Sequence, residues 1–480
     1  MKRIFYICAF PLLLSVSSCE SFLDEQPVSE LSADKFWKNQ DDVVAGIAGM
    51  YDGLQSVVSE RYIDWGEGRS DNFMHGPTST REVKFSFNGL TADLPQLNWD
   101  NLYVTVLRAN LAINYIPGIT GGDLTQGAKN HYLAQAYAMR AYCHFTAVKL
   151  WGDVPLLLEP VSDRNLKIER TPADVVLAQV VEDLNTAASL ANPANASVYE
   201  INIGSIYAIL ADAYMWQKDY ASAIQATDKL QQLNRYTLAK TPLEWNMIFT
   251  NPNNAKEAIW SLFWSFEQDG SNELAARIGS STNTSNYEMD GALLDKWELQ
   301  KKDFRRYLTY DTLQAASGSI SDIYKHYPLE GGVQTLPQQT QAVVQNSLYR
   351  LSDILLMRAE ALNKLGGDAN KEAAIAILNQ IKTRAGVAPV SADQFASQQE
   401  LETAILDERQ LELFAEGKRW FDLRRTDRVI DVMDPVLRRR QEQRGVGVTG
   451  FGDPGFILFP ISRDALNEND NLAQNPPYSR

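Results

Sequence analysis

The 480-residue sequence predicts an all-α-dominated protein, in which helices stack into a solenoid that carries one irregular, loop-rich region. Three observations support this prediction. Apolar side chains recur at helical spacing along both ends of the chain. Two stretches, Ile209–Ile224 and Leu355–Ile381, look like copies of one helix-pair unit. Residues 240–345, between these copies, are rich in Asn, Ser, Thr, Gly and aromatic residues and contain few long periodic runs.

Residues 1–18 are typical of the signal peptide of a bacterial lipoprotein. Lys2 and Arg3 supply a positive start, the run from Ile4 to Val16 is apolar, and small residues stand directly before Cys19. The apolar run is too short to span a bilayer, which takes about 20 residues. We therefore expect cleavage before Cys19 and attachment of acyl chains such as palmitate to it. The alternative is a plain signal peptide followed by an incidental cysteine.

Residues 19–31 are predicted to form an extended tether, because the stretch from Asp24 to Pro27 is polar and broken by proline. Residues 32–239 follow as an N-terminal helical half. Its helical signals lie at 33–57, 98–116, 125–150, from Thr171 onward, 202–217 and 220–233.

The pair at 202–217 and 220–233 resembles a tetratricopeptide unit, with small residues where the helices cross and an aromatic residue at the bend. The second, looser copy near residue 355 makes a tetratricopeptide-like solenoid the preferred prediction. An ordinary antiparallel helix hairpin is the alternative for either copy alone. Within the N-terminal half, residues 60–98 are predicted to be an irregular loop.

Residues 240–345 are predicted to be long loops with short helices and strands, inserted between the two helical halves. Such structured loops on a rigid scaffold are where binding residues concentrate. We expect Ile259–Ser265 to be a buried strand, so that Trp260 and Phe263 belong to the core. Residues 346–480 form the C-terminal helical half, with a short strand expected at Phe456–Ile461.

Composition excludes several classes of partner. The formal net charge is −15, from 45 Lys and Arg against 60 Asp and Glu. This balance argues against nucleic-acid binding and against polybasic docking on anionic lipid. After loss of the signal peptide and lipidation of Cys19, Cys143 is the only cysteine left, so no internal disulfide is expected.

The common catalytic signatures are missing from the sequence. It contains no His-Glu-x-x-His, no Gly-x-Ser-x-Gly and no phosphate loop. The histidines show no metal-ligand spacing, so we predict no metal, no cofactor and no enzyme activity. A glycosidase needs only two carboxylates, however, and composition alone leaves that possibility open. The four histidines are His75, His131, His144 and His326.

Six blocks of the sequence, in order, resemble the SusD/RagB family of outer-membrane nutrient-binding lipoproteins. The resemblance runs nearly from end to end. The blocks are Cys19–Asp24, Lys35–Asp42, Leu150–Leu156, Arg350–Ala361, Asp407–Arg424 and the closing segments Phe459–Ile461 and Gln474–Pro476.

The resemblance implies a helical solenoid with an irregular ligand-binding region packed on it. It also implies a non-catalytic cell-surface lipoprotein that captures oligosaccharides and passes them to a SusC-like TonB-dependent transporter in the outer membrane. Most members handle glycans and a minority handle peptides, so the same role for peptides is the alternative. A lipid-anchored glycoside hydrolase is a further, less favoured one.

Saccharides stack their C–H faces on aromatic rings and pair their hydroxyls with short polar side chains. The segment from residue 64 to residue 72 combines these features most compactly. We expect Trp65 to stack on a sugar and Arg69, Asp71 and Asn72 to bind hydroxyls, with glycines that let the backbone come close. Trp65→Ala should then weaken glycan binding and leave the thermal midpoint nearly unchanged. Alternatively, Asp71 and Asn72 cap a turn and Trp65 anchors the loop.

The central region supplies further candidates for ligand contact. Trp264, Tyr287 and Tyr324 are predicted ligand-binding residues, with Phe266 and Tyr327 as additional aromatics. Tyr287 is favoured as a surface residue because Asn283 and Asn286 stand beside it, whereas Trp99 and Asn101 begin a helix and are predicted to be structural.

Charged residues in the C-terminal helical blocks are predicted to form a salt-bridged network that fixes this half of the protein. The alternative is contact with the transporter or the ligand. These residues are Arg350, Glu360, Glu408, Arg409, Glu412, Glu416, Arg419 and Asp422.

Overall fold

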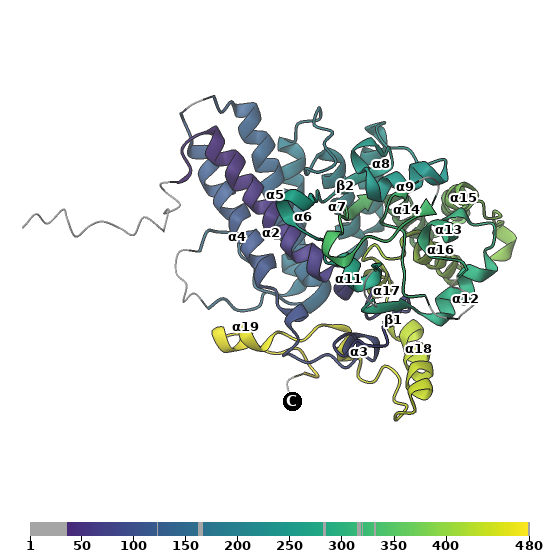
Figure 1. Cartoon of the computed structure of the whole chain (residues 1–480). Helices are drawn as coiled ribbons and strands as arrows, with labels where there is room; N and C mark the ends of the chain where they lie inside the picture. The colour runs from purple at the N-terminus through teal and green to yellow at the C-terminus, as the bar shows by residue number, and fades with distance from the viewer. Residues whose placement is uncertain are drawn as a thin grey trace, which may run out of the picture.

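The computed structural model describes residues 36–121, 123–161, 167–281, 285–313, 318, 320–330 and 333–478 (Figure 1). The predicted signal peptide, the lipidation site Cys19 and the predicted tether lie outside the described residues. Within the described residues, no helix is both long enough and apolar enough to cross a membrane.

The N-terminal half consists of helices that follow the predicted periodicity closely. Helix α2 begins with a capping box, in which the Asn39 side chain accepts from the backbone of Asp41 and Asp42. It ends at Gly66, well beyond the predicted end at residue 57. The helices of this half are α2 (Gln40–Gly66), α3 (Glu82–Ser86), α4 (Asp100–Tyr115), α5 (Gln126–Trp151), α6 (Ala173–Leu190), α7 (Ile203–Trp216) and α8 (Tyr220–Gln232).

Consecutive helices pack side by side and give the molecule its solenoid character. Helix α2 packs on α4, α4 on α5, α5 on α6 and α7 on α8. Figure 1 shows α2, α4 and α5 together at one end of the molecule and α14 to α16 at the other. Helix α8 packs directly on α14, although more than a hundred residues separate the two in sequence. The segment between them is therefore an insertion into a continuous helical stack.

The inserted central region is built of short elements, as its composition predicts. Figure 1 shows α9, α12 and α13 gathered beside α14 to α16. The elements are α9 (Pro242–Thr250), β2 (Ala258–Ser261), α10 (Phe266–Asp269), α11 (Leu274–Ile278), β3 (Tyr287–Met289), α12 (Gly291–Leu299), α13 (Phe304–Thr309), β4 (Leu329–Glu330) and β5 (Val333–Gln334).

Within the described residues, the strands form three two-stranded antiparallel sheets, and two of these tie the central region to the rest of the protein. Strand β1 (Phe73–His75) pairs with β3, with Phe73 opposite Met289. Strand β2 pairs with β6 (Ser347–Arg350), which leads directly into α14, and β4 pairs with β5. The first two sheets join segments that are far apart in sequence, so they fix the central region on the scaffold.

The C-terminal half continues the stack and then wraps back under the N-terminal half. The segment 456–461 differs from its prediction: a 3-10 helix (Pro454–Ile457) stands where a strand is expected, and Phe459 donates its backbone N–H to the carbonyl of Leu150 at 2.9 Å. Residues 82–86, within the stretch 60–98 expected to be an irregular loop, form α3. The C-terminal helices are α14 (Leu351–Leu365), α15 (Asp368–Arg384), α16 (Gln398–Glu412), α17 (Arg419–Arg425), α18 (Val429–Arg444) and α19 (Arg463–Glu468).

The main hydrophobic core runs through both halves. It includes residues of α2, α4, α5 and α14 together with β2 and β6. A second, smaller cluster lies under the central region, where Phe73, Tyr287, Trp297 and Phe414 meet. Each half therefore depends on the other for its burial, which suits a rigid scaffold.

Candidate ligand-binding site

Trp65, the predicted stacking residue, lies in the last turn of α2 and not in a loop. Its side chain is 5% exposed, and its ring meets Trp151 edge-on at a centroid distance of 5.5 Å. The indole N–H donates to the carbonyl of Gln96 at 2.7 Å. The ring thus presents no open face to a saccharide, which corrects the prediction. The alternative interpretation of an anchoring residue agrees with these contacts.

The polar side chains after Trp65 are also engaged within the protein. Arg419 donates from Nε and Nη2 to the two carboxylate oxygens of Asp71, each at 2.8 Å, and this pairing lowers the pKa of Asp71 despite burial. Asn72 donates to Glu67 at 2.6 Å and accepts from Gln410 at 2.9 Å.

Arg69 is buried in the same way. It donates to the carbonyl of Ile457 at 3.2 Å, and its guanidinium carbon lies 4.2 Å from the centroid of the Trp420 ring. Together, these contacts make the segment 64–72 a seam between α2 and the C-terminal half. The predicted role of Arg69 and Asn72 in holding hydroxyls is corrected by their burial, and only Asp71 of this group is partly exposed.

The glycines of this segment allow its backbone to lie close to other parts of the protein. A Cβ on Gly66 would lie 2.1 Å from the carbonyl oxygen of Gly417, and one on Gly68 would lie 2.5 Å from the hydroxyl of Tyr287. The backbone comes close as predicted, but to the C-terminal half and the central region.

Tyr287, the favoured surface aromatic, is fully buried. Its hydroxyl donates to Asp64 at 2.7 Å, and burial raises the pKa of Asp64 to about 6 although this bond lowers it. Asn286, expected to help expose it, donates instead to Glu82 at 3.0 Å. The position of Tyr287 in β3 turns its ring into the second core, which corrects the prediction.

Two predicted ligand-binding residues remain, Trp264 and Tyr324, and both lie in the central region. Trp264 is mostly buried, with its indole N–H donating to the carbonyl of Gly270 at 2.9 Å, and so shapes a loop instead of offering a ring face. Tyr324 is half-buried, and its carbonyl accepts from the backbone of Tyr327 at 2.9 Å.

A cavity of about 350 Å³ opens in the central region beside these residues. Its volume is at the lower end of the range of about 300–1,000 Å³ that small-molecule sites occupy. Aromatic and apolar groups supply part of its wall, and amides and hydroxyls supply the rest. The lining residues are Phe249, Thr250, His326, Tyr327, Pro328, Thr335, Pro337, Gln341, Val343 and Gln345.

Two exposed aromatic residues lie in the chain segment that is hydrogen-bonded to the cavity wall through Trp264. Phe263 and Phe266 are 46% and 48% exposed. They flank Trp264, whose backbone carbonyl accepts from the Gln345 side chain of the cavity wall at 2.9 Å. Phe263 also meets Tyr199 edge-on at 5.3 Å. The segment from Phe263 to Phe266 is therefore joined to the cavity wall through Trp264.

The charge state of the cavity wall is neutral. Burial, together with the neighbouring charge of Lys325, lowers the pKa of His326 to about 4. The Nε2 atom of His326 lies 3.0 Å from the carbonyl of Ala415, so it carries the proton in the neutral ring. None of the described residues that line the cavity is Asp or Glu. The wall therefore offers hydrogen bonds without a net charge.

The predicted network of charged residues is present and joins the central region to the C-terminal half. Arg350 donates to Glu257 and Glu412 at 2.7 and 2.6 Å and to Glu416 at 2.7 and 2.8 Å, all of them buried. The carboxylates keep the pKa of Arg350 well above its usual value despite burial.

The other predicted members of the network also pair within the protein. Arg409 bonds Asp422 at 2.8 and 2.9 Å, and Glu360 pairs with Arg425 at 2.8 Å. These charges are structural, as the sequence predicts.

Sequence reasoning missed most of the cavity wall and the exposure of Phe263. The strand β2 ends at Ser261, so the expected alternation stops before Phe263 and the ring turns outward. The prolines at 328 and 337 signal a turn-rich segment, but no local pattern says that it folds over Phe249. Among the described residues, no group of three His, Cys, Asp or Glu side chains could hold a metal ion.

Comparison with protein families matches most of the chain. The family described as the SusD family matches residues 243–478, and the one described as starch-binding and associating with the outer membrane matches residues 21–215. SusD-like protein P38 from Formosa agariphila is 29% identical over 521 aligned positions, which cover 98% of both chains. The starch-binding protein SusD from Bacteroides thetaiotaomicron is 26% identical over 176 positions, 36% of this chain and 29% of that protein.

Solved structures show the same fold. A SusD superfamily protein from Bacteroides vulgatus superposes with a TM-score of 0.79 at 21% identity, over 92% of this chain and 99% of the other. A laminarin-binding SusD-like protein gives a TM-score of 0.73 at 22% identity, over 92% of this chain and all of the other. With two family matches that together span most of the sequence and neighbours that share the whole architecture, the chain belongs to the SusD/RagB family.

Proposed function

We propose that this protein is a non-catalytic lipoprotein of the cell surface, which captures oligosaccharides and passes them to a SusC-like TonB-dependent transporter in the outer membrane. Family membership supports the carbohydrate-binding role and the association with the outer membrane. The lipoprotein signal and Cys19 support anchoring by acyl chains on the outer face.

The single observation on which the binding proposal rests is the neutral, amide-lined cavity in the central region, and the exposed rings of Phe263 and Phe266 lie in the segment bonded to its wall. Phe263 and Phe266 offer ring faces to the C–H faces of sugar rings, which gain by burial against them. Gln341 and Thr335 offer paired donors and acceptors to hydroxyls, and the Gln345 amide is held by the Trp264 backbone. Tyr324 remains part of the proposed site, because it is half-buried and lies next to the cavity wall.

The absence of catalysis is also a proposal. Glycoside hydrolysis needs a pair of carboxylates that flank the scissile bond. The cavity wall contains none among its lining residues, and its histidine is neutral at pH 7. A ligand held there meets hydrogen bonds and ring faces but neither an acid nor a nucleophile.

The tether and the helical body suit delivery to a membrane partner. A lipid on Cys19, joined to the body through the predicted tether of residues 19–31, holds the body near the membrane at high effective concentration. The shared core of the two halves lets the body move as a unit over the transporter.

Isothermal titration of the mature chain with a panel of neutral oligosaccharides tests the binding site. We expect saturable binding to at least one, and a loss of affinity of about tenfold or more in a Phe263→Ala, Phe266→Ala double variant. The matched control is Tyr307→Ala, which removes an equally exposed aromatic ring outside the cavity. Equal affinities in the double variant and the wild type would place the ligand elsewhere. A peptide that binds while every saccharide fails would replace the glycan role by the peptide role.

A further inference from the structure

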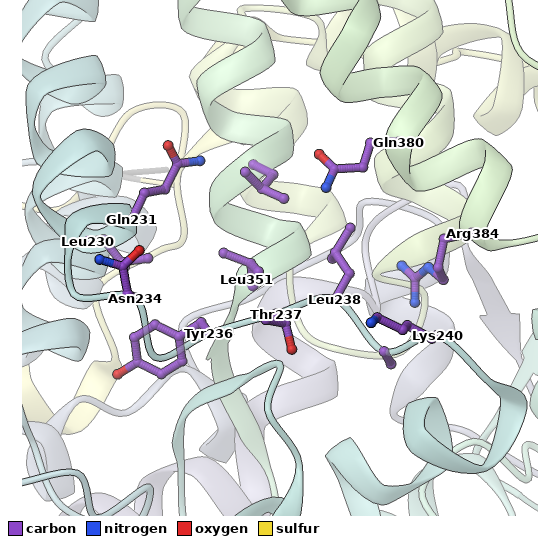
Figure 2. A pocket seen from close by; sticks show the side chains of 12 residues that line it. Leu230, Gln231, Asn234, Tyr236, Thr237, Leu238, Lys240, Leu351, Gln380 and Arg384 are labelled. Carbon is purple, nitrogen blue, oxygen red and sulfur yellow. The ribbon is translucent and has the colours of Figure 1, made fainter.

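A second hollow lies in the helical stack, away from the central cavity. It has a volume of about 520 Å³ and opens between α8, the segment that follows it and the helices α14 and α15 (Figure 2). None of its lining residues is shared with the central cavity. We call it the helical groove.

The floor of the helical groove is aliphatic. Leu230 of α8 and Leu351 and Leu355 of α14 line it and are buried. Figure 2 shows Leu238 and Leu351 in the middle of the groove, between two polar ends. Aliphatic floors bind apolar groups well but lack the ring faces on which sugars stack.

One polar end of the helical groove is cationic. Figure 2 shows the guanidinium of Arg384 turned from α15 toward Lys240. Lys240 is exposed, and among the described residues its ammonium has no ion-pair partner. This end stands out on a protein whose formal net charge is −15.

Arg384 is also incompletely paired. Its side chain is 6% exposed, and its Nε and Nη1 atoms have no hydrogen-bond partner. The Nη2 atom bonds Glu412, but that carboxylate is shared with Arg305 and Arg350. The nearest other carboxylate oxygen, on Glu257, lies 3.8 Å from Nη1. A buried guanidinium whose Nε and Nη1 atoms donate to no acceptor lowers stability unless an anion accepts from them.

The opposite end of the helical groove carries amides. Figure 2 shows Gln231 and Asn234 there, beside the ring of Tyr236, and both amide side chains are exposed. The Tyr236 hydroxyl bonds Asn202 at 3.2 Å, which fixes the ring as a wall. Amide side chains supply a donor and an acceptor each, so they suit amide or hydroxyl groups of a ligand.

We propose that the helical groove is a second ligand site, which binds the carboxylate end of a short amphipathic molecule. The carboxylate lies between Lys240 and Arg384, the apolar body covers the leucine floor, and uncharged polar groups reach the amides at the other end. A short apolar peptide with a free carboxyl terminus and an oligosaccharide that ends in a uronic acid both present this carboxylate. The leucine floor favours the peptide.

Titration with matched pairs of probes tests the proposal on the mature chain. N-acetyl-leucyl-leucine is compared with its carboxyl-terminal amide, and a uronic acid disaccharide with its neutral counterpart. We expect at least one carboxylate to bind in the millimolar range or tighter, and its neutral counterpart to bind about tenfold more weakly or worse. The carboxylate probe that binds more tightly identifies the class of ligand, either peptide or uronic acid.

Two variants separate this site from the central cavity. Lys240→Gln should weaken the carboxylate by about tenfold or more, whereas Lys301→Gln, at an exposed lysine outside the groove, should leave it unchanged. Both are surface substitutions, so the thermal midpoint reports that the fold is intact. The Phe263→Ala, Phe266→Ala variant should bind the carboxylate normally, so failure of the glycan site and failure of this site are distinguishable. The proposal is overturned if neither carboxylate binds, if each binds like its neutral counterpart, or if Lys240→Gln binds like the wild type.

Discussion

Replacing Trp65 by alanine should lower the free energy of unfolding and leave ligand affinity unchanged. The ring is 5% exposed, packs on Trp151 and donates to Gln96. A buried aromatic ring removes about 150–250 Å² from water, which at about 25 cal/mol per Å² amounts to about 4–6 kcal/mol. Substitutions of buried Trp or Phe by Ala cost about 3–5 kcal/mol. The loss of the indole donor adds to this by leaving the Gln96 carbonyl without its partner.

The thermal shift follows from the size of the chain. With an unfolding entropy of about 2.1 cal/mol/K per residue, 480 residues correspond to about 1 kcal/mol/K, so the midpoint should fall by about 3–5 °C. Calorimetry and urea unfolding measure the loss, and titration with the bound oligosaccharide measures the affinity. The Phe266→Ala variant is the matched control: its exposed ring should change stability by less than about 0.5 kcal/mol and weaken binding. A Trp65→Ala protein of wild-type stability that has lost its ligand would refute this reasoning and restore the stacking role.

Three further predictions concern charge and anchoring. Burial raises the pKa of Glu67 from its ordinary value of 4.5 to about 8, so this group stabilises the folded state fully below about pH 4.5 and loses its contribution as the pH rises through 8. Urea unfolding between pH 5 and 8 should show a free energy of unfolding that falls by about 1.4 kcal/mol per pH unit, with a smaller fall in Glu67→Gln; parallel curves would contradict the assignment. Arg350→Ala removes the cation that three buried carboxylates share and should cost about 3–5 kcal/mol in the same assay, whereas Lys218→Ala, at an exposed pair with Asp427, should cost less than about 1 kcal/mol; similar losses would argue against the network. Cys19→Ala should move the protein from the membrane fraction to the soluble fraction of cells, and continued membrane retention would count against lipid anchoring.

The helical part of the fold is predictable because its signals are local. The periodic segments at 203–216 and 220–232 and the capping residues before α7 and α8 determine where these helices lie, whatever packs on them. The end of α2 was not predictable in this way. Gly66 and Gly68 look like loop residues, yet the helix continues to Gly66. A side chain at Gly66 would collide with the backbone of Gly417, so glycine is required there. That contact joins residues 351 positions apart, which no local pattern records.

The site was harder to predict for the same reason. Residue type predicted correctly that aromatics and amides lie in the central region, but only long-range pairing decides which of them face solvent. Tyr287 is buried because β3 pairs with β1, whereas Phe263 is exposed because β2 stops two residues earlier. The charged helical blocks were interpreted correctly, since so many opposite charges at helical spacing have few arrangements other than mutual pairing.

The most direct test of the central claim is to bind and recover the ligand in one experiment. The mature protein is incubated with the oligosaccharide that it binds best, the complex is isolated, and the released saccharide is analysed by mass. We predict that the saccharide is retained by the wild type, is lost in the Phe263→Ala, Phe266→Ala variant, and is recovered at its original length. Recovery of shortened products, or equal retention by the variant, would contradict a non-catalytic binding site in the central region.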